Sequence, residues 1–169
     1  MKKVFLGIGT NLGDRVTNIK NAVAEIVENI GPVVKSSSVY ETEPWGFNTG
    51  DMFLNMVVQA DTELSPSGVL GAILMIETLL GRTRGKKKYS SRIIDIDILL
   101  YEDFVINEAS LKIPHPLMHK RKFVLVPLCE IAPELIHPVL KESFSSLLNS
   151  CTDKNNVKIS HSDPLSAKL

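Results

Sequence analysis

The sequence predicts one globular domain that contains both strands and helices. The 169 residues fit a single domain, and a hydrophobic fraction of 44% with a charged fraction of 22% is typical of a globular protein. Segments with period-two apolar alternation, typical of strands, are interspersed with segments whose apolar residues recur every three or four positions, typical of helices. We expect residues 1–150 to form this domain. Residues 151–169 are polar and lack periodicity, which predicts a loosely ordered tail.

The composition argues against several classes of protein. The 19 basic and 19 acidic residues give a formal net charge of zero, so no overall field attracts the chain to nucleic acid or to a membrane surface. No apolar run reaches the ~18–20 residues of a membrane-spanning helix, and Met1 leads into a short strand rather than a signal peptide. The two cysteines lack the spacing of a zinc site or a disulfide framework. We therefore expect a cytoplasmic monomer without nucleic-acid or membrane partners.

The chain begins with a predicted strand and helix. Residues 2–9 place apolar side chains on one strand face and Gly7 and Gly9 on the other, which leaves room for a group to approach the backbone. Asp14 is a suitable N-cap for an amphipathic helix that ends at Gly31.

Two further strands follow, over residues 33–41 and 53–60. The loop between them is rich in turn-forming residues and contains the only tryptophan, Trp45, either a partly buried anchor or a ligand contact. Phe53 and Asn55 share one strand face. An aromatic ring beside an amide can stack on a flat heterocycle and bond its edge, but a core phenylalanine beside a surface asparagine is the simpler explanation.

The second predicted helix begins at Ser65-Pro66, an N-cap serine followed by a first-turn proline, and ends at Gly81. On this helix, Glu77 interrupts an apolar pattern and is interpreted as a charge at the rim. Beyond the central segment, residues 104–106 predict a short strand. Prolines then flank His115, which favours a fixed imidazole that could donate to a phosphate.

The remaining chain predicts a helix to Ile131, in which Pro127 introduces a kink, and a short helix over residues 143–148.

The central stretch, residues 82–101, carries the strongest functional signal. Asp95 and Asp97 alternate with isoleucines, so both carboxylates point from one face of a strand. Positions two apart on a strand are roughly 7 Å apart at Cα, and such side chains can converge on metal sites about 3.5–4 Å apart. Carboxylates combined with phosphate oxygens are the ligands that Mg²⁺ prefers. Strict alternation would place Arg92 on the isoleucine face, so we expect the strand to begin after it.

Six basic residues lie in the eleven positions that precede this strand. They are Arg82, Arg84, Lys86, Lys87, Lys88 and Arg92. A cationic loop alone is most often only solvated, and paired aspartates can face water on an open sheet. The adjacency of the two features favours a site for a metal and a polyphosphate, because guanidinium groups grip phosphates while carboxylates hold the ion.

Nine short segments match the motifs of one known family in the same order. They are GIGTNLGDR at 7–15, YETEPWG at 40–46, FLNMVV at 53–58, IE at 76–77, GRTR at 81–84, SRIIDIDIL at 91–99, PHPLM at 114–118, RKF at 121–123 and EIAP at 130–133. Over roughly residues 4–135 the chain resembles hydroxymethyldihydropterin pyrophosphokinase. The resemblance implies a ferredoxin-like α+β sandwich, an antiparallel sheet with helices packed on its faces. It also implies Mg²⁺-dependent transfer of the pyrophosphoryl group of ATP to the hydroxymethyl group of 6-hydroxymethyl-7,8-dihydropterin, releasing AMP, in folate biosynthesis.

The resemblance assigns roles residue by residue. Asp95 and Asp97 would bind two Mg²⁺ ions, and Arg82 and Arg92 would contact the transferred phosphates as catalytic residues. The ATP site would comprise Leu70, Glu77, Arg84, Tyr89, Ile98, His115 and Arg121. The pterin site would comprise Thr42, Pro44, Trp45, Gly46, Phe53, Asn55 and Phe123.

Five residues, at three places in the chain, depart from the family pattern. Family members often carry a tryptophan followed by Gly-Pro where this chain has Tyr89-Ser90-Ser91, and we expect Tyr89 to close the loop over ATP. Leu74 and Ser110 replace polar or charged residues that some members use near ATP.

Asp97 is the nearest candidate to accept the proton of the attacking hydroxyl. The alternatives are a kinase that transfers only the γ-phosphate, and a non-catalytic ferredoxin-like module that binds a nucleotide or RNA.

Overall fold

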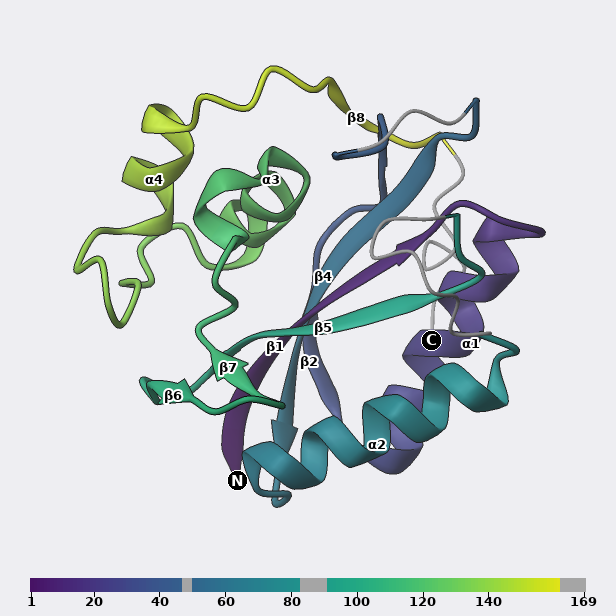
Figure 1. Ribbon diagram of the computed structural model, residues 1–169, viewed down its shortest axis with the longest axis horizontal. Coiled ribbons are helices and arrows are strands. Elements are labelled where there is room, and N and C mark those ends of the chain that lie inside the picture. Colours follow the sequence, from purple (N-terminus) through teal and green to yellow (C-terminus); the bar gives the residue numbers. More distant parts are fainter. Residues whose placement is uncertain (47–49, 83–90, 162–169) are drawn as a thin grey trace.

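The fold is built on an antiparallel sheet with helices on both faces (Figure 1). A computed structural model describes residues 1–46, 50–82 and 91–161. The strands of the main sheet are β1 (Lys2–Thr10), β2 (Val33–Ser36), β3 (Tyr40–Thr42), β4 (Phe53–Thr62), β5 (Asp95–Tyr101) and β8 (Val157–Ile159). The helices are α1 (Arg15–Asn29), α2 (Pro66–Leu79), α3 (Lys122–Ile131) and α4 (Phe144–Ser150), with a 3-10 turn over Met118–Lys120. The strand order is β5-β1-β4-β3-β8, with β2 also paired to β4, and this agrees with the predicted α+β sandwich.

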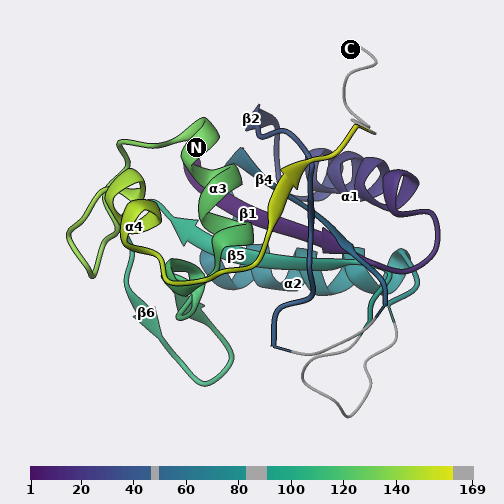
Figure 2. The same cartoon turned by 90° about the horizontal axis from the view of Figure 1, so that it is seen from above.

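The two faces of the sheet carry different helices and different cores (Figures 1 and 2). Helices α1 and α2 pack on a face that includes Leu6 of β1 and Met56 of β4. Helices α3 and α4 pack on the opposite face, which includes Phe5 of β1 and Val57 of β4. Successive buried residues of β1 and β4 therefore belong to different cores, as the pleat requires.

Both long helices begin where the sequence predicts. The Asp14 Oδ1 atom accepts a hydrogen bond from the Thr17 N–H at 3.0 Å, and the Ser65 Oγ atom accepts one from the Gly68 N–H at 3.1 Å. These caps satisfy N–H groups that have no partner inside the first helical turn. Strand β5 starts at Asp95, after Arg92, as predicted.

The predicted strand over residues 33–41 is two strands. The N–H of Ser37 donates to the Val57 carbonyl oxygen at 2.9 Å, and the Ser37 hydroxyl accepts from the Val57 N–H at 3.0 Å. The next N–H, that of Ser38, turns away from the sheet to the carboxylate of Glu130 on α3. The chain therefore bulges out of the ladder before β3 rejoins it. The short strand predicted over residues 104–106 is also displaced, because β6 is Ile106–Asn107, paired with β7 (Lys112–Ile113).

The prediction of a loose tail is wrong for the part of residues 151–169 that the structure describes. Val157–Ile159 forms β8 and pairs antiparallel with β3. The sequence lacks an apolar alternation here because a short strand at a sheet edge is held mainly by its backbone, while its side chains are largely exposed.

Candidate active site

The sheet register gathers the functional residues around two glycines of β1. Gly9 lies opposite Asp95 on β5 and opposite Asn55 on β4, and Gly7 lies opposite Asp97. A Cβ atom on Gly9 would lie only 2.8 Å from the Asn55 Oδ1 atom. The missing side chains leave a hollow on the α3 face of the sheet, as the glycine face of this strand predicts.

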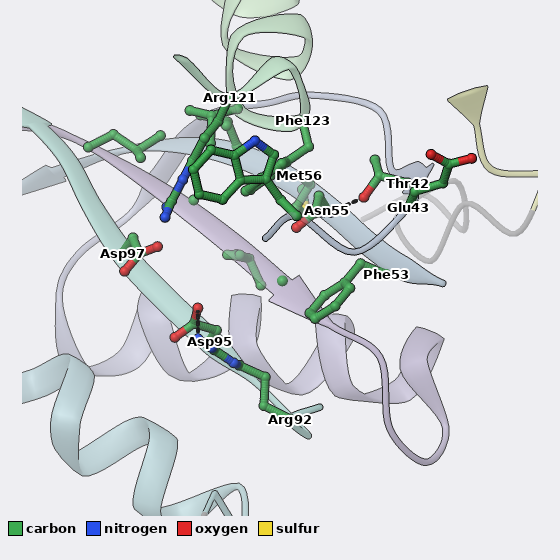
Figure 3. A pocket seen from close by; sticks show the side chains of 17 residues that line it. Thr42, Glu43, Phe53, Asn55, Met56, Arg92, Asp95, Asp97, Arg121 and Phe123 are labelled. Carbon is green, nitrogen blue, oxygen red and sulfur yellow. Dashed lines mark hydrogen bonds and ion pairs between the residues drawn. The ribbon is translucent and has the colours of Figure 1, made fainter. Parts of the chain in front are cut away.

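This hollow is a cavity of about 700 Å³, called the first cavity below (Figure 3). Asp95 and Asp97 line one side of it, and Phe53 and Asn55 line another. The start of α3 contributes Arg121, together with the ring of Phe123 above Asn55. The cavity thus combines aromatic surface, an amide, two acids and a cation.

The amide of Asn55 is held in one orientation. Its Nδ2 group donates to the Thr42 Oγ1 atom at 2.6 Å, and both residues are buried. The amide therefore presents a fixed edge to the cavity, with Phe53 and Phe123 on opposite sides of it (Figure 3). A flat heterocycle fits between two such rings and can bond to such an edge.

Arg121 is a buried cation, 9% exposed, on the wall of the first cavity. Its guanidinium carbon lies 4.7 Å from the centre of the Trp45 ring and 5.7 Å from that of Phe123. Within the described residues its Nε–H has no hydrogen-bond partner. A buried guanidinium with an unfilled donor is suited to an anionic ligand.

Asp95 is held by two arginines. Its carboxylate accepts from the Arg82 Nη1 group at 2.6 Å and from the Arg92 Nη1 group at 2.5 Å. Arg82 also pairs with Glu77. Burial alone would lower the pKa of Arg82, but these two carboxylates together raise it, so the guanidinium stays charged.

Glu77 is buried, 3% exposed, which corrects its interpretation as a rim charge. Besides pairing with Arg82, its carboxylate accepts from the Ile96 N–H at 2.9 Å. Glu77 therefore fixes the start of β5 and the position of Arg82.

Arg92 is placed by Asn11, a residue that sequence reasoning did not single out. The Asn11 Oδ1 atom accepts from the Arg92 N–H at 2.7 Å, and the Asn11 N–H donates to the Arg92 carbonyl oxygen at 3.1 Å. The motif at residues 7–15 contained this asparagine, but its partner 81 positions later is visible only in the fold.

Asp97 is an unusual carboxyl group. Desolvation by the surrounding protein, followed by repulsion from Asp95, raises its pKa to about 7, although Arg121 and Arg92 oppose the shift. Because a bound cation favours the carboxylate, ion binding here would release a proton.

A second cavity of about 490 Å³ follows the edge of the sheet at β5. Leu70 of α2 and Ile98 of β5 give it an apolar wall, while Lys112 and His115 give it polar groups. Asp97 lines both cavities, so the two meet at this carboxyl group.

His115 is a neutral donor. Burial, and then the charge of Arg121, lower its pKa to about 4. Its Nδ1 atom accepts from the Leu117 N–H at 3.1 Å, so the proton of the neutral ring resides on Nε2. This geometry supports the prediction of a histidine that donates to a phosphate.

Most predicted site residues line one of the two cavities. The first cavity contains Thr42, Trp45, Phe53, Asn55, Arg92, Asp95, Asp97, Arg121 and Phe123, and the second contains Leu70, Asp97, Ile98, Ser110 and His115. Arg121, expected at the ATP phosphates, lies in the first cavity. Lys112 lines the second cavity without a signal in the sequence that distinguished it from a surface charge, whereas Glu43, which lines the first, stands inside the motif at residues 40–46.

Other predicted residues lie elsewhere. Pro44 and Gly46 are not among the residues that line the two cavities, and Leu74 is exposed. Arg84 and Tyr89 lie outside the described residues.

The two aspartates fit a magnesium site that is completed by a ligand. Within residues 1–46, 50–82 and 91–161, no group of three or more His, Cys, Asp or Glu side chains is arranged to hold a metal ion alone. Asp97 at the junction of the cavities and Asp95 in the first cavity supply hard oxygen atoms, and phosphate oxygens and water are the usual remaining ligands of Mg²⁺. In the same part of the chain, no helix has the length and apolarity needed to cross a bilayer.

Comparison with known proteins gives a consistent assignment. The family model for 7,8-dihydro-6-hydroxymethylpterin-pyrophosphokinase (HPPK) matches residues 5–133. The 2-amino-4-hydroxy-6-hydroxymethyldihydropteridine pyrophosphokinase of Aquifex aeolicus is 44% identical over 142 residues, 84% of this chain and 88% of that protein. The Bacillus subtilis protein of the same name is 39% identical over 156 residues, 92% of this chain and 88% of that protein.

The solved structures agree in fold. A triple mutant of Plasmodium falciparum HPPK-DHPS, crystallised with SDX-DHP, has a TM-score of 0.73 and 21% identity. The match covers 88% of this chain and 44% of that one, so this chain spans less than half the length of that protein. At this identity the likeness concerns the fold alone.

Proposed function

Because the chain belongs to the 7,8-dihydro-6-hydroxymethylpterin-pyrophosphokinase family, we propose that it transfers the pyrophosphoryl group of ATP to the hydroxymethyl group of 6-hydroxymethyl-7,8-dihydropterin. The products are AMP and the pterin diphosphate, and the reaction is a step of folate biosynthesis. The observation that carries the proposal is the meeting of two chemically different cavities at Asp97.

The first cavity takes the pterin. Phe53 and Phe123 stack on the two faces of the ring, and the amide of Asn55, oriented by Thr42, bonds to its edge. The hydroxymethyl group then points toward Asp95 and Asp97.

The second cavity takes ATP. Leu70 and Ile98 form an apolar wall for the base, while the Nε2–H of His115 and the ammonium of Lys112 bind oxygen atoms of the triphosphate. The phosphate chain runs toward Asp97 and the first cavity, where Arg92 and Arg121 supply cationic donors.

Transfer at phosphorus requires an in-line approach and neutralised phosphate charge, with little covalent chemistry from the protein. Two Mg²⁺ ions held by Asp95 and Asp97 would supply that neutralisation and lower the pKa of the attacking hydroxyl. Arg82 and Arg92 both pair with Asp95, and both would bind the transferred group. Asp97, at the junction of the two cavities, is the nearest candidate to accept the hydroxyl proton.

We further propose that the protein acts as a cytoplasmic monomer. One chain supplies the residues of both cavities, and Cys129 and Cys151 are both free thiols, as a reducing compartment maintains them.

Analysis of the nucleotide product tests the function. The protein is incubated with ATP, Mg²⁺ and the reduced pterin, with parallel reactions that omit the pterin or chelate the metal. AMP formed only in the complete reaction supports pyrophosphoryl transfer. Formation of ADP would instead identify a kinase that moves one phosphate, and binding without any product would identify a non-catalytic module.

A further inference from the structure

Residues 151–160 cross the molecule beside the first cavity and are called the C-terminal strap. The strap leaves α4, passes the start of α3 and ends as β8 beside β3 (Figures 1 and 2). Exposure alternates along it: Asp153, Asn155 and Val157 are partly covered, whereas Lys154 and Asn156 are exposed. The strap is therefore extended, with one side turned toward the protein.

The first attachment is at the start of α3. The Asp153 Oδ2 atom accepts from the Lys122 N–H at 2.9 Å, while its Oδ1 atom accepts from the Asn155 N–H at 3.0 Å. Arg121 occupies the N-cap position of α3, but its side chain makes no capping hydrogen bond to the helix. Asp153 thus caps α3 from a distant part of the chain, and a carboxylate is the preferred charge at a helix N-terminus. The capped residue lies between Arg121 and Phe123, which both line the first cavity.

The second attachment is at the loop after β3, which carries Trp45. The Asn155 Nδ2 group lies 3.5 Å from the Pro44 carbonyl oxygen, next to Trp45, whose ring covers the guanidinium of Arg121. Strand β8 then pairs with β3, with Val157 opposite Thr42, the residue that orients the Asn55 amide.

We propose that the C-terminal strap positions both walls of the first cavity, and that Asp153 and Asn155 are positioning residues for the pterin. The strap residues are not among those that line either cavity, so they act through Thr42, Trp45 and the start of α3. Of the cavity residues that these contacts reach, Thr42, Trp45 and Phe123 are proposed pterin contacts and Arg121 is a proposed nucleotide contact, so the effect falls on the pterin more than on the nucleotide. This inference rests on the proposed function, since the ligand whose binding it concerns is the pterin.

The test compares pairs of variants in the full chain. Asp153→Ala removes the cap, and we expect the KM for the reduced pterin to rise about tenfold while the KM for ATP stays within about twofold. Asp153→Asn keeps an acceptor oxygen and should restore most of the affinity. Asn155→Ala should raise the pterin KM about twofold to threefold, whereas the adjacent, outward-facing Asn156→Ala should leave it unchanged.

A purely structural role would give a different pattern. Circular dichroism establishes that each variant is folded at the assay temperature, and calorimetric titration with the pterin alone measures binding without turnover. Equal pterin affinity in wild type and a folded Asp153→Ala, or equal rises of both KM values, would overturn the proposal. If Asp153→Ala does not fold, the Asn155→Ala and Asn156→Ala pair decides: identical pterin affinities contradict it. Failure of the proposed function is visible separately, since the wild type would then neither bind the pterin nor form AMP.

Discussion

The two faces of the sheet use the same strand, β1, for opposite purposes. On the α1 and α2 face, Leu6 is fully buried in a continuous apolar core. On the α3 face, Gly7 and Gly9 carry no side chains, and the first cavity occupies that space. One face stabilises the domain and the other leaves a hollow between β4 and β5. Stability and ligand binding should therefore respond to different substitutions along a single strand.

The largest effect is expected at the junction of the cavities. Asp97→Ala should lower kcat by about a thousandfold or more, because it removes an expected magnesium ligand and proton acceptor. The unfolding midpoint should not fall, since the substitution removes a desolvated carboxyl group. Steady-state kinetics and urea unfolding measure the two quantities. Asp103→Ala, an exposed carboxylate in the turn after β5, is the control, and near-normal turnover in Asp97→Ala would refute the metal assignment.

The apolar face should show the reverse pattern. Leu6→Ala should lower the free energy of unfolding by about 2–5 kcal/mol, because it leaves a cavity among fully buried side chains. The KM values for ATP and the pterin, measured below the unfolding midpoint, should stay within about twofold of wild type. A large change in the pterin KM would mean that the two faces are coupled.

The glycine face can be tested with a matched pair. Gly9→Ala should raise the pterin KM about tenfold, because its Cβ would lie 2.8 Å from the Asn55 Oδ1 atom and displace the amide. Gly7→Ala should be milder, since its Cβ would meet the flexible side chain of Leu99 at 3.4 Å. Steady-state kinetics with varied pterin concentration measures this KM for both variants. Equal effects at the two glycines would contradict the assignment of the ring edge to Asn55.

The smallest effect concerns pH. Because the pKa of Asp97 rises from 3.8 to about 7 on folding, the folded protein binds more protons than the unfolded chain between those values. The contribution of Asp97 to the free energy of unfolding is therefore fully present below about pH 4, and it is lost as pH rises from there through about 7. Without Mg²⁺, the thermal midpoint of wild type should fall relative to that of Asp97→Asn between pH 5 and pH 8. Parallel curves would show that Asp97 is not desolvated.

Local patterns were sufficient to predict much of this molecule. The caps at Asp14 and Ser65, the glycine face of β1 and the shared face of Asp95 and Asp97 depend on short-range periodicity and turn chemistry, which the sequence states directly. The family motifs extended this to most residues that line the two cavities.

Only the tertiary structure decided the features that depend on contacts between distant residues. The burial of Glu77, the hold of Asn11 on Arg92 and the cap that Asp153 places on α3 join groups that are ordinary polar residues in the sequence. Strand β8 was not predicted for the same reason, because its pairing with β3 uses backbone groups that every residue carries. Apolar periodicity predicts which face of a helix or strand is buried, but it does not predict which polar side chain will bond to which distant partner.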